Sequence, residues 1–331
     1  MQHTIESVGV IRIHSPGGPE VLTWENQPIS EPGPTEVRIR QTAIGLNFID
    51  TYHRNGLYAL PHLPHGIGME AAGVIDQVGS EVIDISVGQH VAYASGSPGA
   101  YAQARIMPAE YMVPLPPGLD DRTAAAILLK GMTTEYLIRR TFRVEPGMVV
   151  LFHAAAGGVG LIASQWLSHL GAIVIGTVGN AAKAELAKSH GCRHVINYAS
   201  EDVVKRVKEL TGGIGVDVVY DGVGKATFEW SMKSLKPRGT LVSFGNASGP
   251  APLVDPLDLS RYGSLFLTRP KLGDYTRTRQ ELLDSAHALF EVIQSGVVSP
   301  LICQTWPLQS AVEAHKALEA RQTTGSSLLI V

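Results

Sequence analysis

The chain has 331 residues and a formal net charge of −3, and 44% of its residues are hydrophobic while 17% are charged. This composition excludes a disordered chain, and the length favours two domains over one hydrophobic core. The slightly acidic balance gives no electrostatic reason to expect nucleic acid or an anionic membrane as a partner.

Features that would direct the chain to a membrane or an oxidising compartment are missing from the sequence. No apolar run approaches the ~20 residues that a bilayer span needs, and the N-terminus lacks a basic region followed by an apolar core. Cys192 and Cys303 are the only cysteines, which excludes a disulfide framework. We therefore expect a cytoplasmic protein without a membrane partner.

The first part of the chain has the pattern of a β-rich domain. Alternating runs such as 36–40 and 72–78 are separated by turns rich in Gly and Pro at 16–19, 31–34 and 114–118. This spacing of strands and turns predicts a partly open barrel.

From about residue 123 the pattern changes to helix and then to alternating strands and helices. The expected strands are 149–153, 172–178, 194–197, 216–220, 239–244 and 264–268. The expected helices between them are 158–170, 181–190, 201–210 and 225–235. This alternation predicts right-handed crossovers and a parallel sheet covered on both faces. Two more helices, at 278–295 and 308–321, precede a terminal strand at 326–331.

A dinucleotide fingerprint follows the first strand of this second part. Ala155, Gly157 and Gly160 have the spacing of G-x-G-x-x-G, with alanine in the first place. Small residues at this turn let the backbone approach a pyrophosphate closely. The helix behind it adds N–H groups and a partial positive charge. The segment therefore predicts a dinucleotide cofactor.

The next strand indicates which dinucleotide is bound. The segment 172–180 ends without the Asp or Glu that usually binds the ribose hydroxyls of NAD. The missing carboxylate removes repulsion against a 2′-phosphate, and Lys183 can supply positive charge to it. A solvated helix lysine is the alternative interpretation of Lys183. We expect NADPH.

Stretches over nearly the whole chain resemble the zinc-free quinone oxidoreductases of the medium-chain dehydrogenase/reductase superfamily, the group that includes zeta-crystallin. The matching stretches are 17–22 (GGPEVL), 43–52 (AIGLNFIDTY), 152–160 (FHAAAGGVG), 242–246 (VSFGN) and 325–328 (GSSL). The resemblance implies an α/β fold class with a GroES-like partly open β-barrel domain at 1–130 and 270–331. A Rossmann doubly wound parallel-sheet domain would occupy 131–269.

The resemblance also implies NADPH-dependent reduction of quinones by hydride transfer, in a metal-free cleft between the domains. A homodimer is implied as well, with the edge strand 264–268 pairing with its twin.

The same resemblance assigns site residues. Around the 2′-phosphate it places Lys183, Tyr198 and Arg321. At the pyrophosphate it places Gly157, Gly158, Val159 and Gly160, with Gly179 near the adenosine. On the nicotinamide side it places Val223, Phe244, Gly245, Asn246 and Leu267. Facing the ring and the substrate cavity it places Phe48 as a cofactor-binding residue and Asn47, Tyr52 and Thr133 as catalytic candidates. The role of Lys130 stays open between cofactor contact and surface charge.

The sequence argues against a zinc site. Zinc-dependent relatives carry a Cys in the segment that matches 43–52, and a Gly-His-Glu triplet further on. Here Asn47 and Met69 stand at those positions. An amide and a thioether are poor zinc ligands, so two of the ligands are lost.

Without a Lewis acid, quinone reduction depends on positioning and on hydride donation. Hydrogen bonds from Tyr52 and Asn47 to a carbonyl oxygen would stabilise its developing charge, unless Tyr52 only packs and Asn47 only holds the cofactor. Two other functions are open: reduction of α,β-unsaturated carbonyls, and an RNA-binding or structural role with NADPH bound. The lack of a basic stripe argues against RNA.

Overall fold

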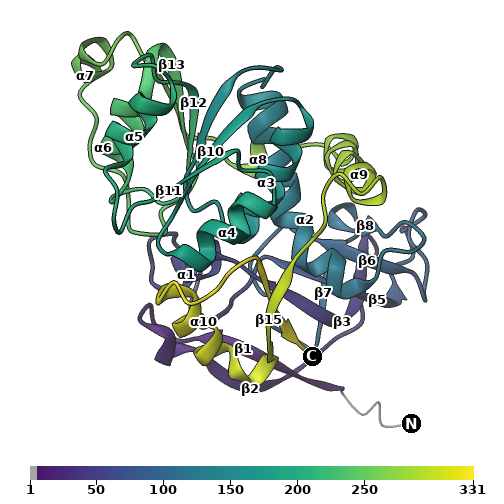
Figure 1. Ribbon diagram of the computed structural model, residues 1–331. Helices are drawn as coiled ribbons and strands as arrows, with labels where there is room; N and C mark the ends of the chain where they lie inside the picture. The colour runs from purple at the N-terminus through teal and green to yellow at the C-terminus, as the bar shows by residue number, and fades with distance from the viewer. Residues whose placement is uncertain (1–5) are drawn as a thin grey trace, which may run out of the picture. The chain divides into compact units, whose positions relative to one another are not determined.

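The computed structural model describes residues 6–331, and the chain divides into two units (Figure 1). The first unit runs to Leu129 and also contains Thr278–Ala286 and Ile302–Val331. The second unit contains Lys130–Arg277 and His287–Leu301. Among the described residues, no helix is both long enough and apolar enough to cross a bilayer.

This division differs from the expected one near the C-terminal end of the second unit. We expected 270–331 to belong wholly to the first domain, but 270–277 and 287–301 group with the second unit. Side-chain contacts explain the difference. Tyr275 stacks on Tyr136 with ring centroids 4.5 Å apart, and Gln165 exchanges two hydrogen bonds with the backbone of Ser299.

The first unit is built mainly from strands. They are β1 (Ser7–Ile13), β2 (Thr23–Pro28), β3 (Glu36–Leu46), β4 (His65–Gly66), β5 (Glu70–Val78), β6 (His90–Tyr93), β7 (Ala104–Pro108), β8 (Val113–Pro114), β15 (Ile302–Pro307) and β16 (Ser326–Ile330). Seven of them form one sheet in the order β15-β16-β3-β5-β6-β8, with β7 paired to β3, and β2-β1-β4 form a second sheet. β-branched side chains such as Ile39, Ile75 and Val91 favour these strands and are buried in one core.

Two short helices belong wholly to this unit. They are α1 (Phe48–Arg54), which directly follows β3, and α10 (Ala311–Glu319), which precedes β16. Two longer helices are shared with the second unit, α2 (Asp121–Tyr136) and α9 (Arg279–Gln294). In Figure 1, α10 lies beside β1 and β2 although these segments are far apart in sequence.

The second unit is a six-stranded parallel sheet. Its strands are β9 (Val149–Phe152), β10 (Ile173–Val178), β11 (His194–Asn197), β12 (Val216–Asp221), β13 (Leu235–Ser243) and β14 (Phe266–Thr268). Their order is β11-β10-β9-β12-β13-β14, and every pairing is parallel. This is the Rossmann order, so the predicted α/β fold class is confirmed.

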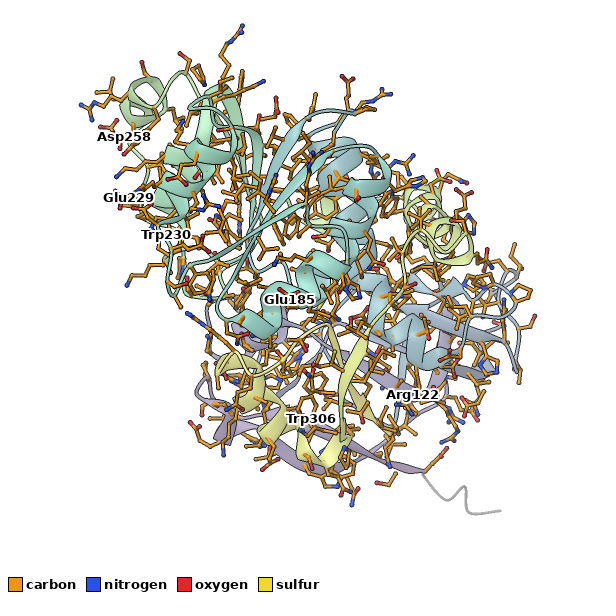
Figure 2. All side chains as sticks on the ribbon, in the orientation of Figure 1. Arg122, Glu185, Glu229, Trp230, Asp258 and Trp306 are labelled. Carbon is orange, nitrogen blue, oxygen red and sulfur yellow. The ribbon has the colours of Figure 1, made fainter. Side chains whose placement is uncertain are left out.

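Helices cover this sheet on both faces. They are α3 (Gly158–His169), α4 (Ala181–Ser189), α5 (Val203–Leu210), α6 (Phe228–Ser234), α7 (Pro256–Arg261) and α8 (Leu272–Tyr275). Figure 1 shows α3 and α4 on one side and α5 and α6 on the other. In Figure 2, Glu229 and Trp230 project from α6, and Trp230 lies 6.2 Å from the Tyr198 ring, centroid to centroid.

Candidate active site

The turn between β9 and α3 has the geometry of a phosphate cradle. Gly157 is the N-cap of α3, and its N–H donates to the Ala154 carbonyl at 2.9 Å. A Cβ on Gly160 would lie 2.5 Å from that same carbonyl oxygen, so only glycine fits there. The next N–H groups begin the helix, where the first turn has no intrahelical acceptors and attracts anions. Gly157, Gly158, Val159 and Gly160 thus lie where the fingerprint predicted.

The end of β10 brings three of the predicted cofactor residues together. A Cβ on Gly179 would meet the Tyr198 hydroxyl at 2.6 Å, so the tyrosine lies directly against this glycine. Asn180 caps α4 by accepting from the Lys183 backbone N–H at 2.9 Å. Lys183 therefore lies in the first turn of α4, beside the strand end that lacks a carboxylate. The ends of β10 and β11 and the start of α4 therefore place Gly179, Tyr198 and Lys183 in one region.

A buried carboxylate organises the turn after β12. One Asp221 oxygen accepts from the backbone N–H groups of Val223 and Gly224 at 2.9 and 3.0 Å. The Thr227 and Ser231 hydroxyls also donate to this carboxylate. The expected helix 225–235 begins only at Phe228, because the preceding residues form this turn. Asp221 is a structural residue that fixes the position of Val223.

The same region holds a buried histidine. His153 lies within 2.9 Å of the Thr177 hydroxyl through Nδ1, and within 3.0 Å of Ser231 through Nε2. Burial lowers the pKa of His153 below its usual value. His153 is therefore a neutral packed group that links β9 and β10 to α6.

The predicted nicotinamide-side residues follow the carboxyl end of β13. The N–H groups of Phe244 and Gly245 donate to the Asp221 carbonyl at 2.8 and 3.3 Å. A Cβ on Gly245 would lie 2.3 Å from the Gly222 carbonyl oxygen, so the two segments are in close contact. Arg269 donates to the carbonyls of Ser243 and Gly245. This fixes the segment that continues to Asn246.

Leu267 lies on the neighbouring strand β14, paired with Leu241 of β13. Val223 and Phe244 to Asn246 follow the carboxyl ends of parallel strands, where this fold binds ligands, and Leu267 lies one residue before the end of β14.

In the first unit, the start of α1 is built around two buried carboxylates. The Asn47 side-chain amide donates to Glu70 at 2.9 Å and to the Gly45 carbonyl at 3.2 Å. The Glu70 carboxylate also accepts from the Leu129 N–H at 2.6 Å. Asp50 accepts from the Asn47 backbone N–H at 2.9 Å. Both N–H groups of the Asn47 side chain are therefore engaged inside the protein.

The other predicted residues occupy separate elements. Phe48 and Tyr52 lie on α1, where the buried Tyr52 ring meets Tyr58 edge-on at 5.3 Å between centroids. Thr133 is half-buried on α2, and Arg321 follows α10 in the first unit with φ at +58°. Lys130 is buried, so it is not a surface charge. The functional roles of these residues stay predictions.

The donor set does not fit a zinc ion. Among residues 6–331, no three His, Cys, Asp or Glu side chains come together in a way that could hold a metal. Glu70, which occupies the glutamate position of the expected triplet, is bonded to Asn47 and to the Leu129 backbone. Burial raises the pKa of the Cys192 thiol to about 11, so this sulfur stays protonated.

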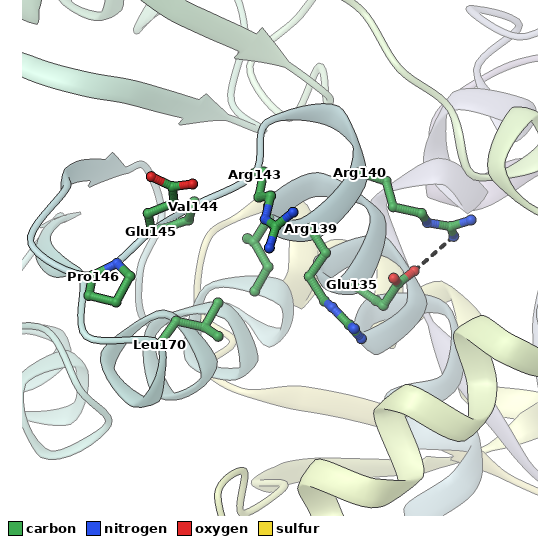
Figure 3. A pocket seen from close by; sticks show the side chains of 9 residues that line it. Glu135, Arg139, Arg140, Arg143, Val144, Glu145, Pro146 and Leu170 are labelled. Atoms are coloured by element: carbon green, nitrogen blue, oxygen red, sulfur yellow. Dashed lines mark hydrogen bonds and ion pairs between the residues drawn. The ribbon is translucent and has the colours of Figure 1, made fainter.

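A hollow of about 800 Å³ in the second unit lies away from these residues (Figure 3). It is lined by the Arg139, Arg140 and Arg143 side chains among others, and Arg140 donates to the Glu135 carboxylate at 2.8 Å. None of the predicted site residues lines it. We therefore place no substrate there.

Sequence reasoning missed a group of buried polar side chains that link α1 to the rest of the first unit. They are Asp50, Arg54, Tyr101 and His315, all almost fully buried. One signal was present in the sequence. His315 shares the buried face of α10 with Ala314 and Leu318, and a polar residue in an apolar helical stripe needs a partner.

Two family descriptions match the chain. "Alcohol dehydrogenase GroES-like domain" matches residues 33–117, and "Zinc-binding dehydrogenase" matches residues 158–287. The matches fall on the β-rich part and on the parallel-sheet part of the chain, respectively.

Full-length relatives are more specific. A quinone oxidoreductase of Pseudomonas aeruginosa is 52% identical over 314 residues, which are 95% of this chain and 97% of that protein. A 2-haloacrylate reductase of a Burkholderia species is 46% identical over 96% of this chain and 97% of that protein. The solved structure of Escherichia coli quinone oxidoreductase complexed with NADPH has a TM-score of 0.96 and 48% identity. That match covers 98% of this chain and 100% of that one.

Proposed function

The chain belongs to the quinone oxidoreductase family of the medium-chain dehydrogenases/reductases, and on that premise we propose that it reduces quinones with NADPH. The proposal rests on sequence identity of 52% and 50% to two quinone oxidoreductases over nearly the whole chain, together with the glycine cradle at the start of α3. NADPH supplies the hydride when it is bound.

The second unit supplies the cofactor contacts in this proposal. Backbone N–H groups of Gly158, Val159 and Gly160 would hold the pyrophosphate, while Gly157, whose N–H donates to the Ala154 carbonyl, lets the backbone approach it closely. A side chain at Gly160 would collide with the turn. Lys183 and Tyr198 bind the 2′-phosphate beside the strand end without a carboxylate, and Arg321 adds positive charge. Val223, Phe244, Gly245, Asn246 and Leu267 orient the nicotinamide side.

The geometry of α1 divides the substrate roles differently from our first expectation. The two side-chain N–H groups of Asn47 donate to Glu70 and to the Gly45 carbonyl, so neither is available to a quinone oxygen. We assign Asn47 to positioning the start of α1. Tyr52 then remains the proposed donor to the quinone oxygen, with Phe48 and Thr133 bounding the substrate.

Stopped-flow oxidation of NADPH tests the proposal. The purified protein should oxidise NADPH with 1,4-benzoquinone well above the uncatalysed rate, and EDTA should leave that rate unchanged because the donor set does not fit zinc. No turnover above background would refute quinone reduction. Loss of turnover with EDTA, restored by zinc, would refute the metal-free proposal.

A second candidate reaction is reduction of an activated alkene, which the full-length match to a 2-haloacrylate reductase favours. Hydride addition to such an alkene needs the same cofactor contacts. Turnover of 2-chloroacrylate and of 1,4-benzoquinone should be measured side by side at equal NADPH concentration. A higher kcat/KM for 2-chloroacrylate would make this reaction the principal activity.

We also propose a homodimer, formed through the edge strand β14. This strand has a sheet neighbour on one side only, in β13, and Phe266 on it is 62% exposed. An apolar side chain on an unpaired parallel edge is a template for pairing with a second copy. Light scattering should give twice the chain mass, and a Phe266→Arg variant should be monomeric. A monomeric wild-type protein would refute this pairing.

A cytoplasmic location completes the proposal. Cys192 and Cys303 are both free thiols, as expected in a reducing compartment. Cell fractionation with an antibody to the chain tests this, and recovery from an extracytoplasmic fraction would refute it.

A further inference from the structure

A relay of hydrogen bonds with a defined direction runs through the first unit. Arg54 Nη1 lies 2.8 Å from His315 Nδ1, and a guanidinium can only donate, so Nδ1 is the acceptor. The other ring nitrogen, Nε2, then carries the proton and donates to the Tyr101 hydroxyl at 2.9 Å. Tyr101 in turn donates to Asp50 at 2.9 Å. Each residue therefore fixes the proton position of the next.

Both ends of this relay are held. At one end Arg54 makes a bidentate pair with Glu319 of α10, at 2.9 and 2.7 Å. At the other end the same Asp50 oxygen that accepts from Tyr101 also accepts from the Asn47 backbone N–H. The relay thus joins α10 to the first residue before α1, across 268 positions of sequence from Asn47 to His315.

We propose that Tyr101 and His315 are positioning residues that set the orientation of α1 and, through it, of Phe48 and Tyr52 toward the substrate. This rests on the proposed function, which places α1 at the substrate. A helix of seven residues is not stable by its own backbone hydrogen bonds, so its orientation depends on tertiary contacts. A buried relay of polarised hydrogen bonds provides such contacts in one geometry only.

A second buried tyrosine provides a matched control. Tyr93 is fully buried in the same unit, and its hydroxyl donates to the buried Gln41 side chain. This pair joins β6 to β3, and the hydrogen bonds found for these two side chains go to residues outside α1. Each hydroxyl makes two hydrogen bonds, Tyr101 with His315 and Asp50, and Tyr93 with Gln41 and, at 3.5 Å, Arg105. Only the Tyr101 hydroxyl lies in the relay.

The experiment compares Tyr101→Phe with Tyr93→Phe in the full-length protein. We expect both variants to lose thermal stability. Tyr101→Phe alone should lower kcat/KM for 1,4-benzoquinone by about 10-fold, as displaced reacting groups do, while the Kd for NADPH changes less than about 2-fold because the second unit holds most of the cofactor. Equal kinetics of the two variants would overturn the proposal.

Hydrogen exchange gives a readout that does not depend on turnover. Amides of residues 48–54 should exchange faster in Tyr101→Phe than in Tyr93→Phe, with unchanged exchange in α3. If the wild-type protein does not reduce quinones, the proposed function fails, but this exchange comparison still decides the positioning role. Equal exchange of 48–54 in the two variants would overturn it.

A second pair of variants covers the case in which Tyr101→Phe does not fold. His315→Gln keeps both a donor and an acceptor, whereas His315→Leu keeps neither. We expect His315→Gln to retain most of the wild-type kcat/KM and slow exchange in α1, and His315→Leu to lose both. Identical behaviour of these two variants would overturn the relay.

Discussion

His315 makes the stability of the first unit depend on pH in a direction that the structure defines. Burial, and then the neighbouring Arg54 charge, lower the pKa of His315 from 6.5 to about 3. The charged and titratable groups around it are Arg54, Tyr101, Asp50 and Glu319. Replacing His315 by Gln removes the titration and keeps a side chain that can donate to Tyr101.

The sign follows from proton binding. Between pH 6.5 and pH 3 the unfolded chain binds a proton at His315 that the folded chain does not, so the free energy of unfolding falls as pH falls. From these two pKa values, His315 lowers the free energy of unfolding by almost nothing at pH 7.5 and by about 2 kcal/mol at pH 5. The loss approaches about 5 kcal/mol below pH 3. His53 changes stability in the same direction, because burial lowers its pKa to about 4.

The comparison of wild type with His315→Gln removes the contribution of His53, which is present in both proteins. Urea unfolding at pH 7.5, 6.5, 5.5 and 5.0 would be followed by the fluorescence of Trp24 and Trp306, both in the first unit. Trp166 and Trp230 are replaced by Phe in both proteins, so that the second unit contributes no tryptophan fluorescence. Wild type should lose about 2 kcal/mol more than His315→Gln between pH 7.5 and 5.0. An equal loss in both would refute a neutral, buried His315.

Three further predictions concern the second unit. Lys183→Glu should weaken NADPH binding by about 10-fold or more with little change for NADH, since it sets a carboxylate against the 2′-phosphate. Fluorescence titration measures the Kd of each cofactor, and an equal loss of affinity for both would contradict the role assigned to Lys183. Gly160→Ala should abolish NADPH binding, because its Cβ would lie 2.5 Å from the Ala154 carbonyl oxygen. Gly157→Ala should retain binding, because its Cβ would lie 3.2 Å from that oxygen. The same titration compares the two variants, and weaker binding by Gly157→Ala than by Gly160→Ala would contradict the cradle. Asp221→Ala should lower the stability of the second unit by about 3 kcal/mol, because the Val223 and Gly224 N–H groups lose their acceptor and the Thr227 and Ser231 hydroxyls keep only their bonds to backbone carbonyls. A loss below about 1 kcal/mol in thermal or urea unfolding would show that this carboxylate does not hold the turn.

Much of the second unit was predictable because its signals are local. The strand 194–197 is observed with the predicted bounds, and the helix after the fingerprint begins at Gly158 as expected. Apolar periodicity and small residues at turns are patterns of neighbouring positions, so they can be recognised without knowing the tertiary structure. The strand expected at 264–268 is shorter, Phe266–Thr268, after Ser264 with φ at +56°.

Partners distant in sequence were not predictable. Tyr101 and His315 are 214 positions apart, and neither lies in a recognisable motif. The amide of Asn47 looked available to a substrate until the fold showed both of its N–H groups bonded to Glu70 and Gly45. Which donor meets which acceptor depends on how β3, β5 and α10 pack, and residue type alone does not specify that.

The sequence by itself determined the family, the α/β fold class and the turn that fits a dinucleotide, because each depends on contiguous residues whose chemistry is local. Only the tertiary structure decided that Asn47 is a held residue, that Asp221 builds the turn beside Val223, and that His315 is joined to α1. Those decisions depend on hydrogen bonds between distant segments, and such bonds become strong and costly to leave unmade once burial has removed competing water.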